Sequence, residues 1–259
     1  MKKLSFFIIA SLLLVTSCKK DDAATDPSAA TSDDAAQIVG ETLASNGGGA
    51  TAAMTGSLAA SGSASVISGL RSASTSPTSG THLKDTTITV TTPAGALATV
   101  NFTSTLTLTK ATNDSSLTAT HTYNGTVDAP LYTAAHSGTG TYTFTNLGTL
   151  VGTTFHPDSI WTMNGGYTRT GTHTIKLSNK TMHHTTNATF TNVLMNRLTR
   201  TIKSGTGSFT ITGYAGTDPT KKTFSYAGTL TFDNNTSATV IIGGKSYLIR
   251  LLDGNVTPK

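Results

Sequence analysis

Two histidines that face each other across a predicted hairpin are the residues best placed for chemistry. His173 and His184 fall in consecutive segments of alternating apolar and polar residues, joined by Ser178-Asn179. A two-residue loop there would pair His173 with His184, and opposite Cβ atoms of neighbouring strands lie about 4.5–5.5 Å apart. Two imidazoles at that separation can share a ligand or a metal ion.

Two further side chains extend this pair to a candidate pocket. Arg169 has the same strand parity as His173, and His121 lies on the apolar face of an earlier segment. The residues of the predicted ligand pocket are His121, Arg169, His173 and His184. We expect no metal ion and no cofactor in it. The alternative is that these histidines bind nothing, because a one-residue slip in register turns a side chain to the opposite face.

Basic residues gather in the same part of the chain. No Asp or Glu stands between Asp158 and Asp218, whereas several Lys and Arg residues do. The predicted anion-binding face consists of Arg169, Lys176, Lys180, Arg197, Arg200 and Lys203. Such a face would attract anionic glycan or lipid. Nucleic acid is not an expected partner, because the charges are sparse and the N-terminus predicts secretion.

The sequence contains no recognisable catalytic motif. Glu41 is the only Glu, and most Asp residues stand at predicted turns, where they commonly cap the backbone. A pair of carboxylates suited to glycoside hydrolysis is therefore not expected. No Gly-x-Ser-x-Gly string marks the nucleophile elbow of a serine hydrolase. We therefore expect no enzymatic activity.

The N-terminus has the layout of a secretory signal peptide. Lys2 and Lys3 precede an apolar run at residues 4–15, which is shorter than the helix of about 20 residues that crosses a bilayer. Small residues follow, and then Cys18, the only Cys of the chain. Residues 1–17 are therefore predicted to be a signal peptide.

The residues around Cys18 predict a lipid anchor. Val15-Thr16-Ser17-Cys18 resembles a bacterial lipobox, and Lys19-Lys20-Asp21-Asp22 resembles the start of mature lipoproteins of the Bacteroidota. The resemblance implies acylation of Cys18 and attachment to the outer membrane through N-terminal acyl chains, at the cell surface or on the periplasmic face. Several acyl chains give stable attachment, at about 0.8 kcal/mol per buried methylene.

A tether and a helical region follow the anchor. Residues 18–32 are rich in Asp, Ala, Ser and Thr, a composition typical of flexible tethers. Within residues 33–80, which are also rich in Gly, apolar side chains recur at helical spacing and predict a helix over 33–45, capped by Thr31 and Asp34. A second helix is predicted over 52–60. We expect these helices to dock on the rest of the protein.

Residues 81–259 are predicted to form an all-β domain. Thr alternates there with apolar residues, and turn signals such as Asn124-Gly125 and Gly243-Gly244 separate the runs. The pattern indicates about eleven or twelve strands joined by short turns, which require antiparallel neighbours. The predicted fold is an antiparallel meander rolled into a barrel-like or sandwich form, with a short N-terminal helix.

These features leave two hypotheses about function. The first is a lipid-anchored envelope or cell-surface protein with a β-rich binding or structural domain. The alternative is a carrier of lipid or other hydrophobic cargo within the curled sheet. A tightly filled interior favours the first hypothesis, whereas an apolar trough of several hundred Å³ favours the second.

Overall fold

The computed structural model describes residues 29–45, 49–61, 80–91, 97–110, 116–128, 132–151, 154–176, 179–220, 222–234 and 236–259. The predicted signal peptide, Cys18 and most of the predicted tether lie outside these ranges. The helices are α1 (Ser32–Leu43) and α2 (Ala50–Ser61). The strands are β1 (Gly80–Thr91), β2 (Leu97–Lys110), β3 (Leu117–Asp128), β4 (Tyr132–Thr145), β5 (Gly148–Val151), β6 (Thr154–Pro157), β7 (Ile160–Ile175), β8 (Lys180–Asn196), β9 (Thr201–Ala215), β10 (Thr223–Phe232), β11 (Ser237–Ile242), β12 (Lys245–Arg250) and β13 (Val256–Pro258).

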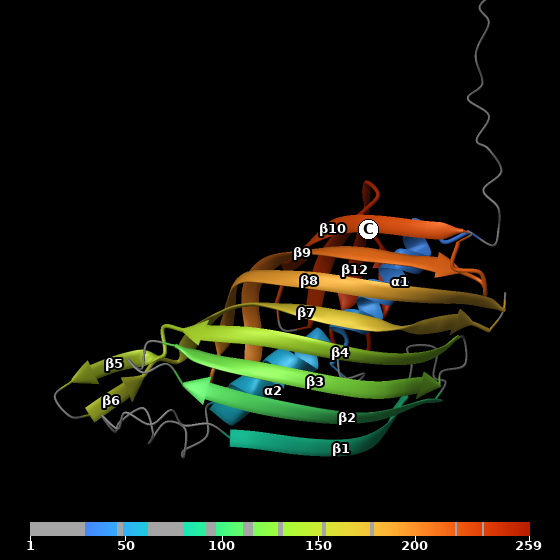
Figure 1. Ribbon diagram of the computed structural model, residues 1–259. Coiled ribbons are helices and arrows are strands. Elements are labelled where there is room, and N and C mark those ends of the chain that lie inside the picture. Colours follow the sequence, from blue (N-terminus) through green and yellow to red (C-terminus); the bar gives the residue numbers. More distant parts are fainter. Residues whose placement is uncertain are drawn as a thin grey trace, which may run out of the picture.

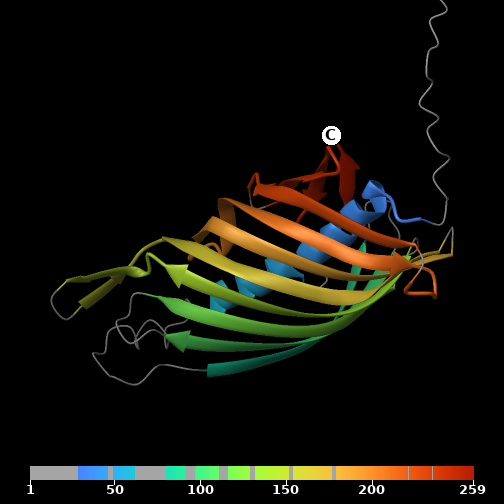
Figure 2. The same cartoon turned by 45° about the horizontal axis from the view of Figure 1, so that its top comes forward.

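Eleven of these strands form one antiparallel sheet. Their order is β1-β2-β3-β4-β7-β8-β9-β10-β11-β12-β13, so each strand pairs with the one before it, and β5 and β6 form a separate hairpin inserted between β4 and β7. The figures show the sheet curling around α1 and α2, which lie along its concave side (Figures 1 and 2). The sheet does not close, because β1 and β13 are its two edges. The predicted all-β meander is confirmed, and its form is an open roll.

The sequence explains why α1 begins where it does. The side chain of Thr31 accepts a hydrogen bond from the Asp34 amide at 3.2 Å, and the Asp34 carboxylate accepts one from the Thr31 amide at 2.8 Å. This capping box satisfies two amides that have no partner within the helix. Asp33 and Asp34 also place negative charge at the positive end of the helix dipole. The predicted helix is therefore confirmed, with its last residue at Leu43.

The helices and the sheet share one hydrophobic core. Ile38 and Leu43 of α1 and Met54 and Leu58 of α2 are fully buried, in the same cluster as Trp161 of β7. α2 contains no charged residue, as expected for a helix enclosed by other elements. The helical segment and the β-domain predicted as separate stretches of the chain therefore pack as one unit.

The two turn signals have different outcomes. Gly243 and Gly244 join β11 to β12 with positive φ values of 56° and 78°, as a tight hairpin turn requires. Asn124-Gly125, in contrast, lies inside β3, where its two residues pair with Ser137 and His136 of β4. The prediction of a turn there is wrong, because pairing with long strands on both sides overrides the local preference.

A close contact between two glycines fixes α1 against the turn between β12 and β13. A Cβ atom on Gly40 would lie 2.3 Å from the carbonyl oxygen of Gly254, whereas a Cβ atom on Gly56 of α2 would meet nothing within 4 Å. We expect Gly40→Ala to lower the free energy of unfolding by about 1–3 kcal/mol, because overpacking outweighs the gain in helix propensity. The matched variant Gly56→Ala should gain up to about 1 kcal/mol. Urea denaturation measures both, and equal stability of the two variants would contradict this packing.

Candidate functional site

A cluster of buried ionisable side chains lies where α1 meets the concave face of the sheet. We call it the buried polar cluster, and it consists of Glu41, His121, His136, Arg169, His173 and His184. Glu41 comes from α1, and the others come from the four adjacent strands β3, β4, β7 and β8. Ionisable side chains are rarely buried unless they are paired, so each member needs its own physical account.

Arg169 is the centre of this cluster. Its side chain is only 1% exposed, and its Nη2 donates a hydrogen bond to Nδ1 of His136 at 2.6 Å. The same Nη2 lies 3.5 Å from Oε2 of Glu41. A guanidinium can only donate, so Nδ1 of His136 is the unprotonated nitrogen and Nε2 of this neutral ring carries the proton.

Glu41 also pairs with His173. Its Oε1 lies 2.8 Å from Nδ1 of His173, and the His173 ring stacks on Tyr132 with 4.9 Å between ring centroids. Burial alone would lower the pKa of His173, but the Glu41 carboxylate outweighs it and raises that pKa above its usual value. Burial alone would raise the pKa of Glu41, but the positive charges of His173 and Arg169 outweigh this effect and lower that pKa. One carboxylate is thus shared by two basic side chains.

The other three histidines of the cluster are neutral at neutral pH. Burial lowers the pKa of His121 to about 4. Burial and the positive charge of Arg169 lower the pKa of His184 to about 4 and that of His136 still further. His121 and His136 are connected through Tyr123, whose ring centroid is 6.4 Å from the first and 5.1 Å from the second.

The structure brings the four predicted pocket residues onto one face, although the predicted hairpin register is wrong. Ile175 pairs with Lys180, so His173 lies opposite Met182 instead of His184. This shift of two residues leaves every side chain on its predicted face, because the side-chain period of a strand is two. All four side chains are buried. The binding of a ligand by them stays a prediction.

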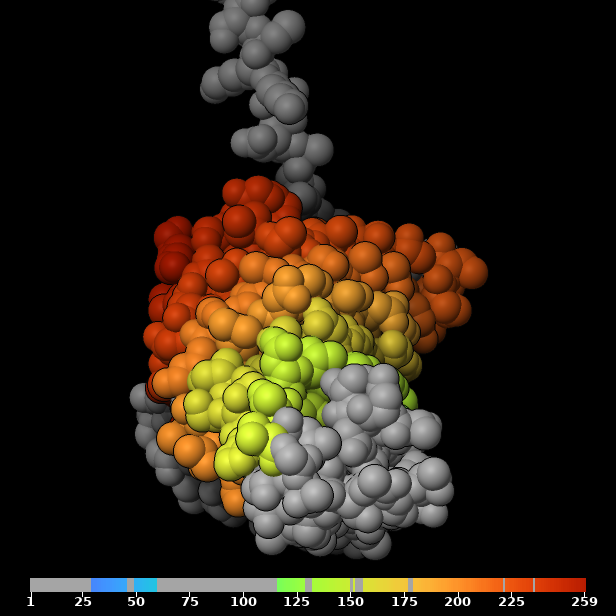
Figure 3. Space-filling view, turned by 90° about the vertical axis from the view of Figure 1, so that its left-hand side faces the viewer, coloured from blue at the N-terminus to red at the C-terminus, as the bar shows by residue number. Residues whose placement is uncertain are grey.

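The predicted anion-binding face is not assembled. Arg169 is buried inside the roll, Lys176 and Lys180 flank the turn between β7 and β8, and Arg197 and Arg200 lie at the turn between β8 and β9. Lys203 follows that second turn on β9. The two turns are at opposite ends of β8, about 50 Å apart at the rise of a strand. The amide of Arg197 donates a hydrogen bond to the carbonyl oxygen of Ser159, which follows β6. Arg197 therefore lies at the end of the molecule that carries β5 and β6, the end that faces the viewer in Figure 3.

Two members of the cluster are absent from the sequence prediction. Glu41 is the only Glu of the chain, and its place in a helix expected to dock on a sheet is the signal that points to it. His136 has the same strand parity as the buried Ala134, so period-two alternation places it on the concave face. Neither signal shows which side chain each one contacts, because the contacts join distant parts of the chain.

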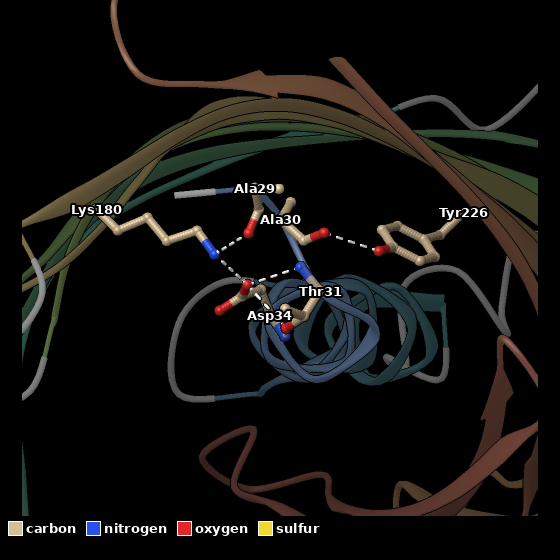
Figure 4. Close-up of polar contacts among 6 residues, drawn as sticks. All are labelled: Ala29, Ala30, Thr31, Asp34, Lys180 and Tyr226. Atoms are coloured by element: carbon tan, nitrogen blue, oxygen red, sulfur yellow. Dashed lines mark hydrogen bonds and ion pairs between the residues drawn. The ribbon is translucent and has the colours of Figure 1, made fainter. Parts of the chain in front are cut away.

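Polar contacts at the start of α1 fix the position of Glu41. Lys180 donates to Asp34 at 2.6 Å and to the carbonyl oxygen of Ala29 at 2.5 Å, and Tyr226 donates to the carbonyl oxygen of Ala30 at 2.9 Å (Figure 4). These bonds hold the start of the helix to β8 and β10. The helix then carries Glu41 two turns further on, to Arg169 and His173.

No protein-family model, curated protein or solved structure matches this chain. Within the described ranges, no group of three or more His, Cys, Asp or Glu side chains is arranged to hold a metal ion. None of the described helices is both long and apolar enough to cross a membrane.

Proposed function

We propose that this protein is a lipid-anchored envelope protein of the outer membrane, and that its open β-roll is a binding or structural module. The lipobox-like residues that end at Cys18 support the anchor. The filling of the concave side by α1 and α2 is the observation that supports a module rather than a carrier. Ile38, Leu43 and Met54 occupy there the apolar surface that cargo would need.

The chain between the anchor and the fold limits how far the roll can stand from the membrane. The carbonyl of Ala29 is bonded to Lys180, so the chain meets the sheet at the start of β8. Ala29 is eleven positions after Cys18, and a fully extended chain of that length reaches at most about 40 Å. The proposal therefore places Lys180, at the start of β8, within about 40 Å of the lipid surface.

The anchor has a direct test. We expect Cys18→Ala to move the protein from the detergent phase to the aqueous phase in a detergent partition, because no acyl chain is then attached. The intact mass of the mature wild-type protein should exceed that of a chain starting at Cys18 by the mass of the acyl groups. Both proteins should unfold at the same urea concentration, since the residues of the hydrophobic core are the same in both. Identical partition of variant and wild type would contradict the lipid anchor.

A carrier of hydrophobic cargo is the second candidate function. It is favoured by α2, which has no charged residue and contributes Met54 and Leu58 to the apolar core. If α2 left the sheet, a ligand could take the place of these side chains. Saturable binding of a fluorescent fatty acid by the intact protein would distinguish a carrier from a module with a filled interior.

A further inference from the structure

Several buried donors in the polar cluster lack an acceptor. Nε and Nη1 of Arg169 and Nε2 of His136 have no hydrogen-bond partner among the residues that the structure describes, although these side chains are only 1% and 5% exposed. The two groups are adjacent, since Nη2 of Arg169 bonds to Nδ1 of His136 at 2.6 Å. Folded proteins seldom leave buried donors unpaired, because each loses its bonds to water without replacement.

The cluster also contains fewer negative than positive side chains. Glu41 is its one carboxylate, and Arg169 and His173 both draw on it. Asp34, which also acts on His173, pairs with Lys180, and Asp253, which acts on Tyr132, pairs with Arg250. With His173 protonated, the cluster therefore carries one more positive charge than negative charge.

We propose that the buried polar cluster binds a small monovalent anion, chloride or a short carboxylate, at the free donors of Arg169 and His136. The anion would accept hydrogen bonds from these donors and balance the second positive charge. It must be small because α1 covers the cluster and is held there by the bonds of Lys180 and Tyr226 to the start of the helix. This inference does not rest on the lipid anchor or on the function proposed above.

Thermal unfolding of the full mature protein tests the site. Sodium gluconate, whose anion is bulky, sets a constant ionic strength, and chloride, formate or acetate replaces it stepwise at pH 7. A bound anion stabilises only the folded state, so the melting temperature should rise saturably, by about 5–10 °C at a hundredfold excess over Kd. Equal melting temperatures in all four anions would overturn the proposal. An increase with a long-chain carboxylate alone would also overturn it and favour the carrier.

Variants locate the site on the named donors. Arg169→Met should abolish the anion-dependent shift, but it also removes a paired buried charge and endangers folding. His136→Phe keeps a ring of similar size but removes both the Nε2 donor and the Nδ1 acceptor that positions Arg169, so it should reduce the shift at least several-fold. His156→Phe, at an exposed position on β6, is the matched control and should retain the full shift. Line broadening of ³⁵Cl⁻ in NMR should fall in the same order, and a full effect in His136→Phe would contradict the assignment.

Discussion

Glu41→Gln is expected to lower the free energy of unfolding by about 3–5 kcal/mol, because it leaves the buried charges of Arg169 and His173 without their carboxylate. The amide of Gln has nearly the same shape as the carboxylate, so the loss reports charge rather than packing. Trp161, the only Trp and fully buried, provides the fluorescence signal for urea denaturation.

A matched control separates this effect from the loss of any ion pair. Asp128→Asn makes the same chemical change at a pair with Lys176 whose side chains are 70% and 41% exposed, and it should cost less than about 1 kcal/mol. The double variant Glu41→Leu with Arg169→Met should lose much less than the sum of the single losses, because it removes both charges together. A cost for Glu41→Gln no larger than that of Asp128→Asn would show that the cluster does not hold α1.

The concave face of the sheet could be predicted from the sequence, because parity along a strand survives errors in register. The predicted hairpin misplaced His173 and His184 by two residues, and both still point to the interior. The cap at Thr31 was also readable, since its partner is only three residues away. Period and local spacing are properties of a short window of sequence.

The partners within the cluster could not be predicted in this way. Glu41 and Arg169 are 128 residues apart, and only the placement of α1 inside the roll brings them together. The predicted anion-binding face is not assembled, because residues close in sequence can lie far apart in space. Lys180 and Arg197 are near in sequence but lie at opposite ends of one 17-residue strand. Proximity along the chain and proximity in space diverge most in a sheet of long strands.

Acid is expected to destabilise the protein before its carboxylates are protonated. The pKa values of His121 and His184 are about 4 in the folded state and about 6.5 in the unfolded chain. Below pH 6.5 the unfolded chain therefore binds protons that the folded protein does not, and stability falls until about pH 4. Each of these histidines should cost about 2 kcal/mol at pH 5, and His136 acts in the same direction.

His173 and Glu41, the two other titrating members of the cluster, do not account for a loss of stability between pH 6.5 and 5. The pKa of His173 is raised, so its contribution is complete below about pH 6.5 and declines as the pH rises from there toward that raised value. The pKa of Glu41 is lowered, so its contribution is complete above about pH 4.5 and is lost as the pH falls from there toward that lowered value. A loss between pH 6.5 and 5 therefore belongs to the neutral histidines.

Urea denaturation at pH 7.5, 6.5 and 5 measures this loss, which should reach about 3 kcal/mol for His121 and His184 together between pH 6.5 and 5. His184→Asn should reduce by about one the number of protons taken up on unfolding, which the slope of the unfolding free energy against pH measures. This holds whatever the variant does to the stability at pH 7.5. His156→Asn, on the exposed strand β6, should leave the pH dependence unchanged. If stability were constant between pH 7.5 and 5, the histidines would not be held neutral by burial, and the excess of positive charge around Arg169 would need another account.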